Sequence, residues 1–218
     1  MNSITISLIL ASAPKFFEGQ EGKSSRCTFK GTFSIQQKDQ TLSYAIPVEC
    51  WGHTAEYVRD LEEGAGALVV GTLIERELPN HQYKTTGIKA DQVVLYVGAS
   101  TAPINFVAAC GNLGRDPEAK YFESGNVKAT TSIATKDRKD THWLNITAWG
   151  KTAEVMADYA KKGTRIGIKG QLQFDQWEKD GEVKQRLHIN ANSLELMGSK
   201  NQERELVGVS VGSADDDF

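Results

Sequence analysis

Apolar and polar residues alternate along segment 143–149, which is the period of a strand with one buried face. The positions on one side are aliphatic, namely Leu144, Ile146 and Ala148. Trp143 and Trp149 lie six residues apart and therefore share the opposite side. The pattern predicts a strand whose inward face is aliphatic and whose outward face carries a tryptophan near each end.

A short helix is predicted after this strand. Small and apolar residues recur at the spacing of one helical face, at Ala153, Met156, Ala157 and Ala160. Thr152 suits the N-cap of the helix, and Gly163 suits the turn that ends it. Two further strands are predicted at 166–177 and 184–197, joined by a hairpin turn at Asp180-Gly181.

This arrangement occurs twice in the chain. The string Trp51-Gly52-His53-Thr54-Ala55-Glu56 recurs 98 positions later as Trp149-Gly150-Lys151-Thr152-Ala153-Glu154. The first repeat has matching strand patterns at 4–10, 27–35, 45–51, 67–73 and 88–97. Five strands with a helix between the third and the fourth is the element order of the OB-fold, a small barrel that binds oligonucleotides or oligosaccharides.

The predicted fold is therefore all-β with one short helix per domain, as tandem five-stranded OB-fold barrels plus a flexible acidic C-terminal tail. We predict a divergent first domain at 1–98, a second domain at 103–198 and a tail at 199–218, with a boundary near 99–103. A chain of 218 residues suits two domains of about 100 residues each.

Charge is distributed unevenly over these parts. The net charge of the whole chain is -3, which by itself argues against a nucleic-acid partner. Residues 1–98 carry 9 Lys and Arg against 11 Asp and Glu, residues 99–198 carry 14 against 12, and residues 199–218 carry 2 against 5. The second domain is thus the only basic part, and the tail masks its charge in the average.

Composition also bears on the location and the class of the protein. No apolar run approaches the roughly 20 residues of a membrane span, and the N-terminus lacks the pattern of a secretory signal, so we expect a cytoplasmic, nucleoid-associated protein. Cys27, Cys50 and Cys110 have no pair or ligand spacing and suit small buried positions. No phosphate-binding loop, nucleophile elbow or histidine ligand spacing occurs. We therefore expect no enzyme, no cofactor and no metal site.

The second repeat resembles the bacterial-type single-stranded DNA-binding protein family, in its two-OB-domain form. The resemblance rests on ordered motifs over some 95 residues, among them Asn105-Phe106-Val107, the stretch Gly111-Asn112-Leu113-Gly114-Arg115-Asp116-Pro117, Tyr121-Phe122-Glu123, Thr141-His142-Trp143, the Trp149-Gly150 string and Gly170-Gln171-Leu172. It implies sequence-tolerant binding of single-stranded DNA, four OB domains assembled as a homodimer, and recruitment of replication and repair proteins by the tail.

Binding of a single strand needs aromatic surfaces for the bases and cations for the backbone. The resemblance places Trp143, Trp149 and Trp177 at base-stacking positions, although tryptophans in a barrel often belong to the core. The candidate cations are Lys136, Arg138, Lys139, Lys151, Lys161, Lys162, Arg165, Lys169, Lys179, Lys184 and Arg186, any one of which is equally well a solvated surface residue. Trp51 is the one candidate tryptophan in the first domain.

The acidic tip resembles the partner-binding tip of the family and comprises Asp215, Asp216, Asp217 and Phe218. We expect it to bind replication and repair proteins. The alternative function is a specialised adaptor, a primosome or recombination accessory in which the barrels mainly contact proteins and DNA binding is secondary.

The two domains are expected to be unequal. Alignment through the Trp-Gly string pairs Ala45 with Trp143 and Glu49 with Thr147, so the first outward face has lost a tryptophan and gained an anion in the path of the phosphates. Pro47 removes a backbone donor, which suits an edge strand or a bulge. Tyr44 should point inward. Weak DNA contacts in the first domain are expected only from Phe16, Phe17, Trp51, Lys84 and Lys89.

Overall fold

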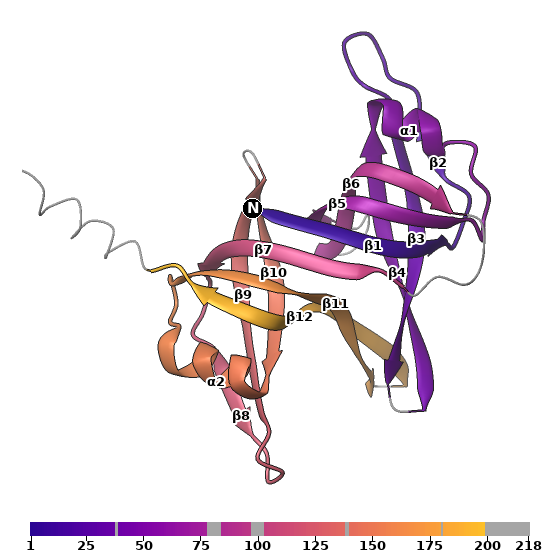
Figure 1. Cartoon of the computed structure of the whole chain (residues 1–218). Helices are drawn as coiled ribbons and strands as arrows, with labels where there is room; N and C mark the ends of the chain where they lie inside the picture. The colour runs from indigo at the N-terminus through magenta and orange to yellow at the C-terminus, as the bar shows by residue number, and fades with distance from the viewer. Residues whose placement is uncertain (38, 78–83, 97–102, 138–139, 180, 199–218) are drawn as a thin grey trace, which may run out of the picture.

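A computed structural model describes residues 1–37, 39–77, 84–96, 103–137, 140–179 and 181–198. These residues form two barrels, each with one short helix (Figure 1). The first barrel comprises β1 (Asn2–Leu10), β2 (Lys15–Phe17), β3 (Arg26–Gln37), β4 (Gln40–Trp51), α1 (Gly52–Val58), β5 (Gly66–Glu77) and β6 (Lys84–Tyr96). The second comprises β7 (Asn105–Leu113), β8 (Glu118–Tyr121), β9 (Val127–Asp137), β10 (Asp140–Trp149), α2 (Gly150–Tyr159), β11 (Arg165–Lys179) and β12 (Glu182–Leu196).

The predicted fold class is confirmed, because both repeats form OB-type barrels and every predicted strand is present. The strand pairs β3–β4 and β11–β12 run further than predicted, to Gln37↔Gln40 and Lys179↔Glu182. Their distal residues are mostly exposed on both faces, so the alternation that marks a strand in the sequence fades there. The short strands β2 and β8 were not predicted.

The prediction of Thr152 as the helix N-cap is wrong. Helix α2 begins at Gly150, with Trp149 in the N-cap position and no side-chain cap. Gly150 has a φ of 54°, which lets the chain leave strand β10 and enter the helix within one residue. The helix ends at Tyr159, and Gly163 follows in the turn to β11 with a φ of 87°.

The core of each barrel is built from alternate strand residues. In β10, Leu144, Ile146 and Ala148 are buried, as the pattern predicts. Cys27 and Cys50 are buried free thiols, and the structure sets them opposite each other in strands β3 and β4. Desolvation by burial raises the pKa of Cys50 to about 12, so this thiol stays protonated and acts as a small apolar residue.

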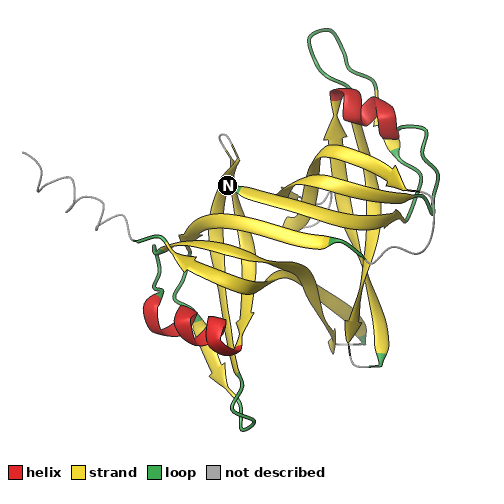
Figure 2. Ribbon diagram, in the orientation of Figure 1, coloured by secondary structure: helices red, strands yellow, loops and turns green. Residues whose placement is uncertain are grey.

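The two barrels share one continuous sheet. Strands β1 and β7 pair in antiparallel fashion from Asn2↔Ala109 to Ile6↔Asn105, and this pairing joins the halves into a twelve-stranded sheet. Within each half the barrel is completed by a parallel pair, β4 with β6 and β10 with β12. Figure 2 shows the two helices at opposite ends of the molecule, outside the joined strands.

Pro47 does not mark an edge or a bulge. Strand β4 lies between β3 and β6, and Pro47 is in regular register opposite Lys30. The parallel pairing of β4 with β6 begins at Val48↔Ile88, so Pro47 lies one residue before the first paired residue of that ladder.

Several predictions lie outside the described residues: most of the boundary region 99–103, the tail 199–218, Arg138 and Lys139. Among the helices that the structure describes, neither is long and apolar enough to cross a membrane.

Candidate nucleic-acid interface

The outward face of β10 carries two open tryptophan side chains. Trp143 and Trp149 are 45% and 46% exposed, while the aliphatic residues between them are buried. Six residues of extended chain separate the two rings, which is about 20 Å. The prediction that these two residues share an exposed face is confirmed, and the distance leaves room for more than one nucleotide between them.

Trp143 packs closely against the main chain of Gly114. A Cβ added at Gly114 would lie 2.9 Å from Trp143 Cη2 and 3.1 Å from Cε3, both too close for carbon atoms. The absence of a side chain at Gly114 therefore provides the seat that the six-membered ring of the indole occupies, and the side chain remains about half exposed. The repeat contains a signal for this role, because Ala11 replaces Gly114 in the first repeat, where Ala45 replaces Trp143.

Trp149 belongs to a cluster of rings and cations. Its ring stacks with Phe122 at a centroid distance of 5.9 Å and an interplanar angle of 22°. Lys128 Nζ lies 5.2 Å from the Trp149 ring centroid, and Lys120 Nζ lies 5.1 Å from that of Phe122. Such a cluster offers a flat surface to a base beside positive charge for a phosphate. Sequence reasoning missed Phe122, Lys120 and Lys128 as site residues.

The register of the strands explains why these residues gather. Lys128 stands directly opposite Trp149 in the β9–β10 pair, and Lys120 stands opposite Lys128 in the β8–β9 pair. Because residues opposite one another in a sheet point to the same side, the two lysines share the outward face of Trp149. Strand β8 supplies one of these partners, and it is one of the two short strands that the alternation did not reveal.

A basic groove adjoins Trp143. Three of the predicted cations line it, Lys136, Lys162 and Arg165, around a volume of about 620 Å³. Its floor includes Asn112 and Ala134, and Ala134 stands directly opposite Trp143 in the β9–β10 pair. The groove thus continues the outward face of Trp143 with three positive charges, one from β9, one from the turn that leads into β11 and one from the first residue of β11.

The remaining predicted residues are more scattered. Arg186 donates a hydrogen bond to Asn145 Oδ1 at 3.1 Å, which places its guanidinium between the two tryptophans of β10. Trp177 is 42% exposed near the end of β11, opposite Lys184, with Lys179 two residues further along. The hairpin residues thus form a third group at the far end of the second barrel.

Three other predicted lysines lie outside these groups of residues. Lys151 on α2 forms an ion pair with Glu154 at 3.0 Å, and this hydrogen-bonded partner raises the pKa of Lys151. Lys169 stands opposite Ala108 and Ser193 on the outer side of the central strands, beside a groove that it shares with Met197. Lys161 is exposed in the turn before β11.

The first barrel has a related but internally neutralised site. Trp51 is 46% exposed, and the Arg26 guanidinium lies over it at 5.3 Å and over Phe17 at 5.9 Å from the ring centroids. Glu49 forms ion pairs with both Arg26 and Arg76 at 3.1 Å, and its side chain is only 13% exposed. The expectation that Glu49 presents an open anion to the phosphates is wrong, since two arginines enclose its carboxylate.

Two other residues of the first barrel are committed to contacts with the second. Lys89 Nζ forms an ion pair with Asp137 at 3.0 Å. Tyr44 points inward, as predicted, and packs against Phe174 of the second barrel with ring centroids 5.2 Å apart. Desolvation raises the pKa of Tyr44. Neither residue is placed to serve as an open contact for DNA.

No group of three or more His, Cys, Asp or Glu side chains within the described ranges is arranged to hold a metal ion. The chemistry offered by the second barrel consists instead of exposed rings, cations and a shallow basic groove. These groups can stack on planar ligands and neutralise anionic ones, and they require no bond to be made or broken.

Comparison with known proteins agrees with this geometry. Residues 104–197 match the model of the single-strand binding protein family. The chain is 44% identical to single-stranded DNA-binding protein 1 of Synechocystis sp. over 109 residues, which is 47% of this chain and 90% of the relative. It is 41% identical to single-stranded DNA-binding protein 2 of Nostoc sp. over 105 residues, covering 46% of this chain and 83% of the relative.

Solved structures extend the likeness of fold to both barrels. The wild-type single-stranded DNA-binding protein of Thermus aquaticus superposes with a TM-score of 0.71 at 21% identity, covering 100% of this chain and 97% of that one. A deletion mutant of the same protein gives a TM-score of 0.72 at 22% identity, covering 90% and 94%. At this identity the superposition shows a common fold, with two barrels in one chain.

Proposed function

Because this chain belongs to the single-strand binding protein family, we propose that it binds single-stranded DNA in a sequence-tolerant way and catalyses no reaction. The observation that supports this most directly is the outward face of β10. Trp143 and Trp149 lie on that face about 20 Å apart, each about half exposed, and each has lysine or arginine side chains nearby.

In the proposed complex, bases stack on Trp143 and Trp149 while phosphates meet the flanking cations. Lys136, Lys162 and Arg165 serve the first ring, and Lys120 and Lys128 serve the second. Stacking has little base preference, because every base has a flat π face. Arg186 lies between the two rings and Trp177 extends the path toward the distal hairpin.

Titration with oligo-dT tests the proposal. Intrinsic tryptophan fluorescence should be quenched strongly and with a defined stoichiometry. The double change Trp143→Ala and Trp149→Ala should weaken binding by roughly 2 to 6 kcal/mol, from about 1 to 3 kcal/mol for each stacked base. Absence of quenching in the wild-type chain would contradict the proposal and favour the adaptor role in primosome or recombination assemblies.

We propose further that the second barrel carries most of the DNA binding. In support of this, the outward face of β4 has Ala45 at the position of Trp143 in β10. The tryptophan that remains on this face, Trp51, lies beside Arg26, whose charge Glu49 already neutralises. The first barrel then contributes mainly to the assembly. Comparison of single changes at Trp51 and Trp149 separates the two barrels.

The proposed assembly is a homodimer with four OB domains, taking 1–98 and 103–198 as the two domains of each chain. Its candidate interface is the outer side of the central strands, where Val94, Ile104 and Phe106 are 53%, 46% and 48% exposed beside the small polar residues of β1. A self-complementary apolar face suits twofold pairing. Sedimentation as a monomer at micromolar concentration would contradict this assembly.

The acidic tip, Asp215 to Phe218, is proposed to recruit replication and repair proteins. Its terminal ring and carboxylate suit an apolar pocket with a basic rim. Deletion of these four residues should abolish capture of such partners in a pull-down and leave DNA affinity unchanged or slightly raised. A clear loss of DNA affinity in the truncated chain would contradict this role.

A further inference from the structure

Besides the pairing of β1 with β7, the two barrels meet at two junctions that occupy equivalent positions in the repeat but differ in chemistry. Counting back from the Trp-Gly strings, Tyr44 in the first repeat corresponds to His142 in the second. In each strand pair these residues stand opposite a second equivalent pair, Phe33 and Thr135. Each junction therefore uses the same backbone positions, and its side chains decide what kind of contact forms.

One junction is apolar. Phe33 and Tyr44 of the first barrel pack against Phe174 of the second, with ring centroids 5.2 to 5.9 Å apart. Phe33 and Phe174 are buried. Such a contact stabilises the association of the barrels through burial, and it is not directional.

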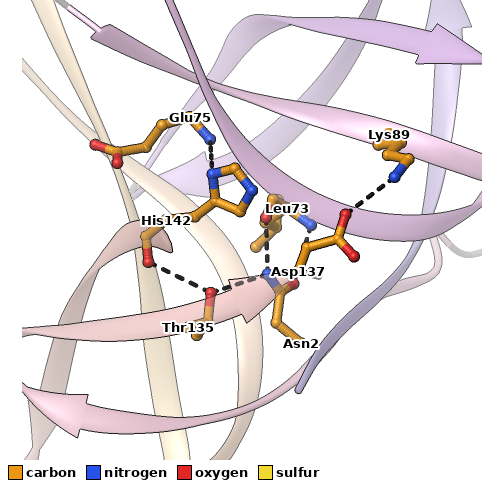
Figure 3. Close-up of polar contacts among 7 residues, drawn as sticks. All are labelled: Asn2, Leu73, Glu75, Lys89, Thr135, Asp137 and His142. Atoms are coloured by element: carbon orange, nitrogen blue, oxygen red, sulfur yellow. Dashed lines mark hydrogen bonds and ion pairs between the residues drawn. The ribbon is translucent and has the colours of Figure 1, made fainter. Parts of the chain in front are cut away.

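The other junction is a directional hydrogen-bond network (Figure 3). Glu75 replaces the aromatic residue, since it corresponds to Phe174 in the repeat. Its backbone N–H donates to His142 Nδ1 at 3.1 Å. The Thr135 hydroxyl donates to the carbonyl oxygen of His142 at 3.4 Å, and Asn2 Nδ2 donates to Thr135 Oγ1 at 3.3 Å. His142 is thus held from both barrels, through its buried imidazole by the first and through its main-chain carbonyl by the second.

The same network includes the main chain of Trp143, the residue on which we propose that a base stacks. The backbone N–H of Trp143 donates to Glu75 Oε2 at 3.0 Å, so one residue of the first barrel holds both His142 and its neighbour. Hydrogen bonds to a carboxylate are shorter and stronger than those to a neutral acceptor. The ring of Trp143 is seated at the same time on Gly114. Main chain and ring are therefore both fixed before any ligand arrives.

The apolar junction has no such residue to orient. The position equivalent to Trp143 is Ala45, which follows Tyr44. A hydrogen-bond network thus holds the main chain at the junction that carries a tryptophan. The junction that carries an alanine is built from ring packing, with one exposed hydrogen bond beside it from Gln185 to the Ser43 carbonyl oxygen. The chemistry of each junction follows the presence of the stacking residue.

We propose that Glu75 is a positioning residue for Trp143, through which the first barrel orients the stacking ring of the second. This inference rests on the proposed function and deepens it. Glu75 does not meet the DNA through its charge; its carboxylate holds the Trp143 main chain. The divergent first barrel then contributes to DNA binding through the second barrel's ring.

The free protein provides the first test. We would record the fluorine NMR spectrum of the full chain labelled with 5-fluorotryptophan, with single Trp→Phe changes to assign the signals. Glu75→Ala should shift or broaden the Trp143 signal and leave the Trp149 signal unchanged, which also reports an intact fold. Glu75→Gln keeps an acceptor of the same length and should preserve the wild-type Trp143 signal. Glu75→Leu replaces the alanine variant if the latter loosens the barrel.

Affinity for oligo-dT provides the second test. Loss of the acceptor in Glu75→Ala should weaken binding by about 3- to 10-fold, and Glu75→Gln should stay within about 2-fold of the wild type. In the Trp143→Ala background, Glu75→Ala should add no further loss. The exposed Glu63 supplies a matched control, because Glu63→Ala removes the same charge far from the junction.

Three outcomes would overturn the role of Glu75. They are an unchanged Trp143 signal in Glu75→Ala, tighter DNA binding in Glu75→Ala and Glu75→Gln alike, and an equal loss of affinity with and without Trp143. Failure of the wild-type chain to bind oligo-dT would instead contradict the proposed function, and the spectrum of the free protein would still decide whether Glu75 orients Trp143.

Discussion

Gly114→Ala should weaken DNA binding by displacing the ring of Trp143. The added Cβ would lie 2.9 Å from Cη2 and 3.1 Å from Cε3, and closer still to the ring carbon between them. Carbon atoms in contact are about 3.5 to 4.0 Å apart, so the indole has to move by about 1 Å or turn to another rotamer. Either movement takes the ring away from the position it holds beside the basic groove.

The size of the effect follows from stacking. A base stacked on an aromatic side chain contributes about 1 to 3 kcal/mol, and a displaced ring keeps part of that contact. We therefore expect a loss of about 1 to 2 kcal/mol, which raises Kd by about 5- to 30-fold. Gly114 does not have a positive φ, so alanine introduces no backbone strain there and the melting temperature should remain near that of the wild type.

Fluorescence anisotropy of a labelled dT oligonucleotide measures the change directly. The reciprocal variant Ala11→Gly is the matched control, because Ala11 and Gly114 make equivalent backbone hydrogen bonds in the two barrels and Ala11 faces no tryptophan. It should bind as the wild type does. Wild-type affinity in Gly114→Ala, or the same loss in a Trp143→Ala background, would refute the role of Gly114 as the seat of the ring.

Three further predictions concern the first barrel and pH. Trp149→Ala should cost about 1 to 3 kcal/mol in oligo-dT affinity, whereas Trp51→Ala should change Kd by about 3-fold or less; equal losses at unchanged melting temperature would show that the barrels share the strand evenly. Glu49→Gln removes the partner of two arginines and should steepen the dependence of log K on log salt by about 0.7 to 1.4, and an unchanged slope would mean that phosphates do not reach them. Burial lowers the pKa of His188 below its usual 6.5 despite Asp175 at 3.8 Å, so the unfolded chain binds the proton more readily and stability is lost as the pH falls below 6.5. In urea unfolding at about pH 7.5 and about pH 5, His188→Gln should lose less stability on acidification than the wild type, and an equal loss in both would contradict this assignment.

Much of the fold could be read from local patterns. Side chains alternate between the two faces of a strand, so the order of residues in 143–149 predicts which ones are buried and which two are exposed. The two Trp-Gly strings show that the second half of the sequence repeats the first. Aligning the halves through these strings pairs Ala45 with Trp143. The residues on the outward face of β10 were therefore predictable, because the direction of a strand side chain depends only on its place in the alternation along the chain.

The partners of those residues were decided by the tertiary structure. Lys136 lies on β9, far in the sequence from Lys162 and Arg165, and only the closure of the second barrel brings it to the groove that they line. The sequence suggested that Glu49 is an exposed anion, but in the folded sheet its carboxylate forms ion pairs with two arginines. Tyr44 and His142 hold the same place in the repeat, but one meets a phenylalanine and the other a glutamate. A strand fixes the side on which a residue points. The atoms that it meets there come from strands 23 to 130 positions away in the chain, as the pairs Arg26–Glu49 and Tyr44–Phe174 show, and the placement of those strands depends on barrel closure and on the pairing of β1 with β7.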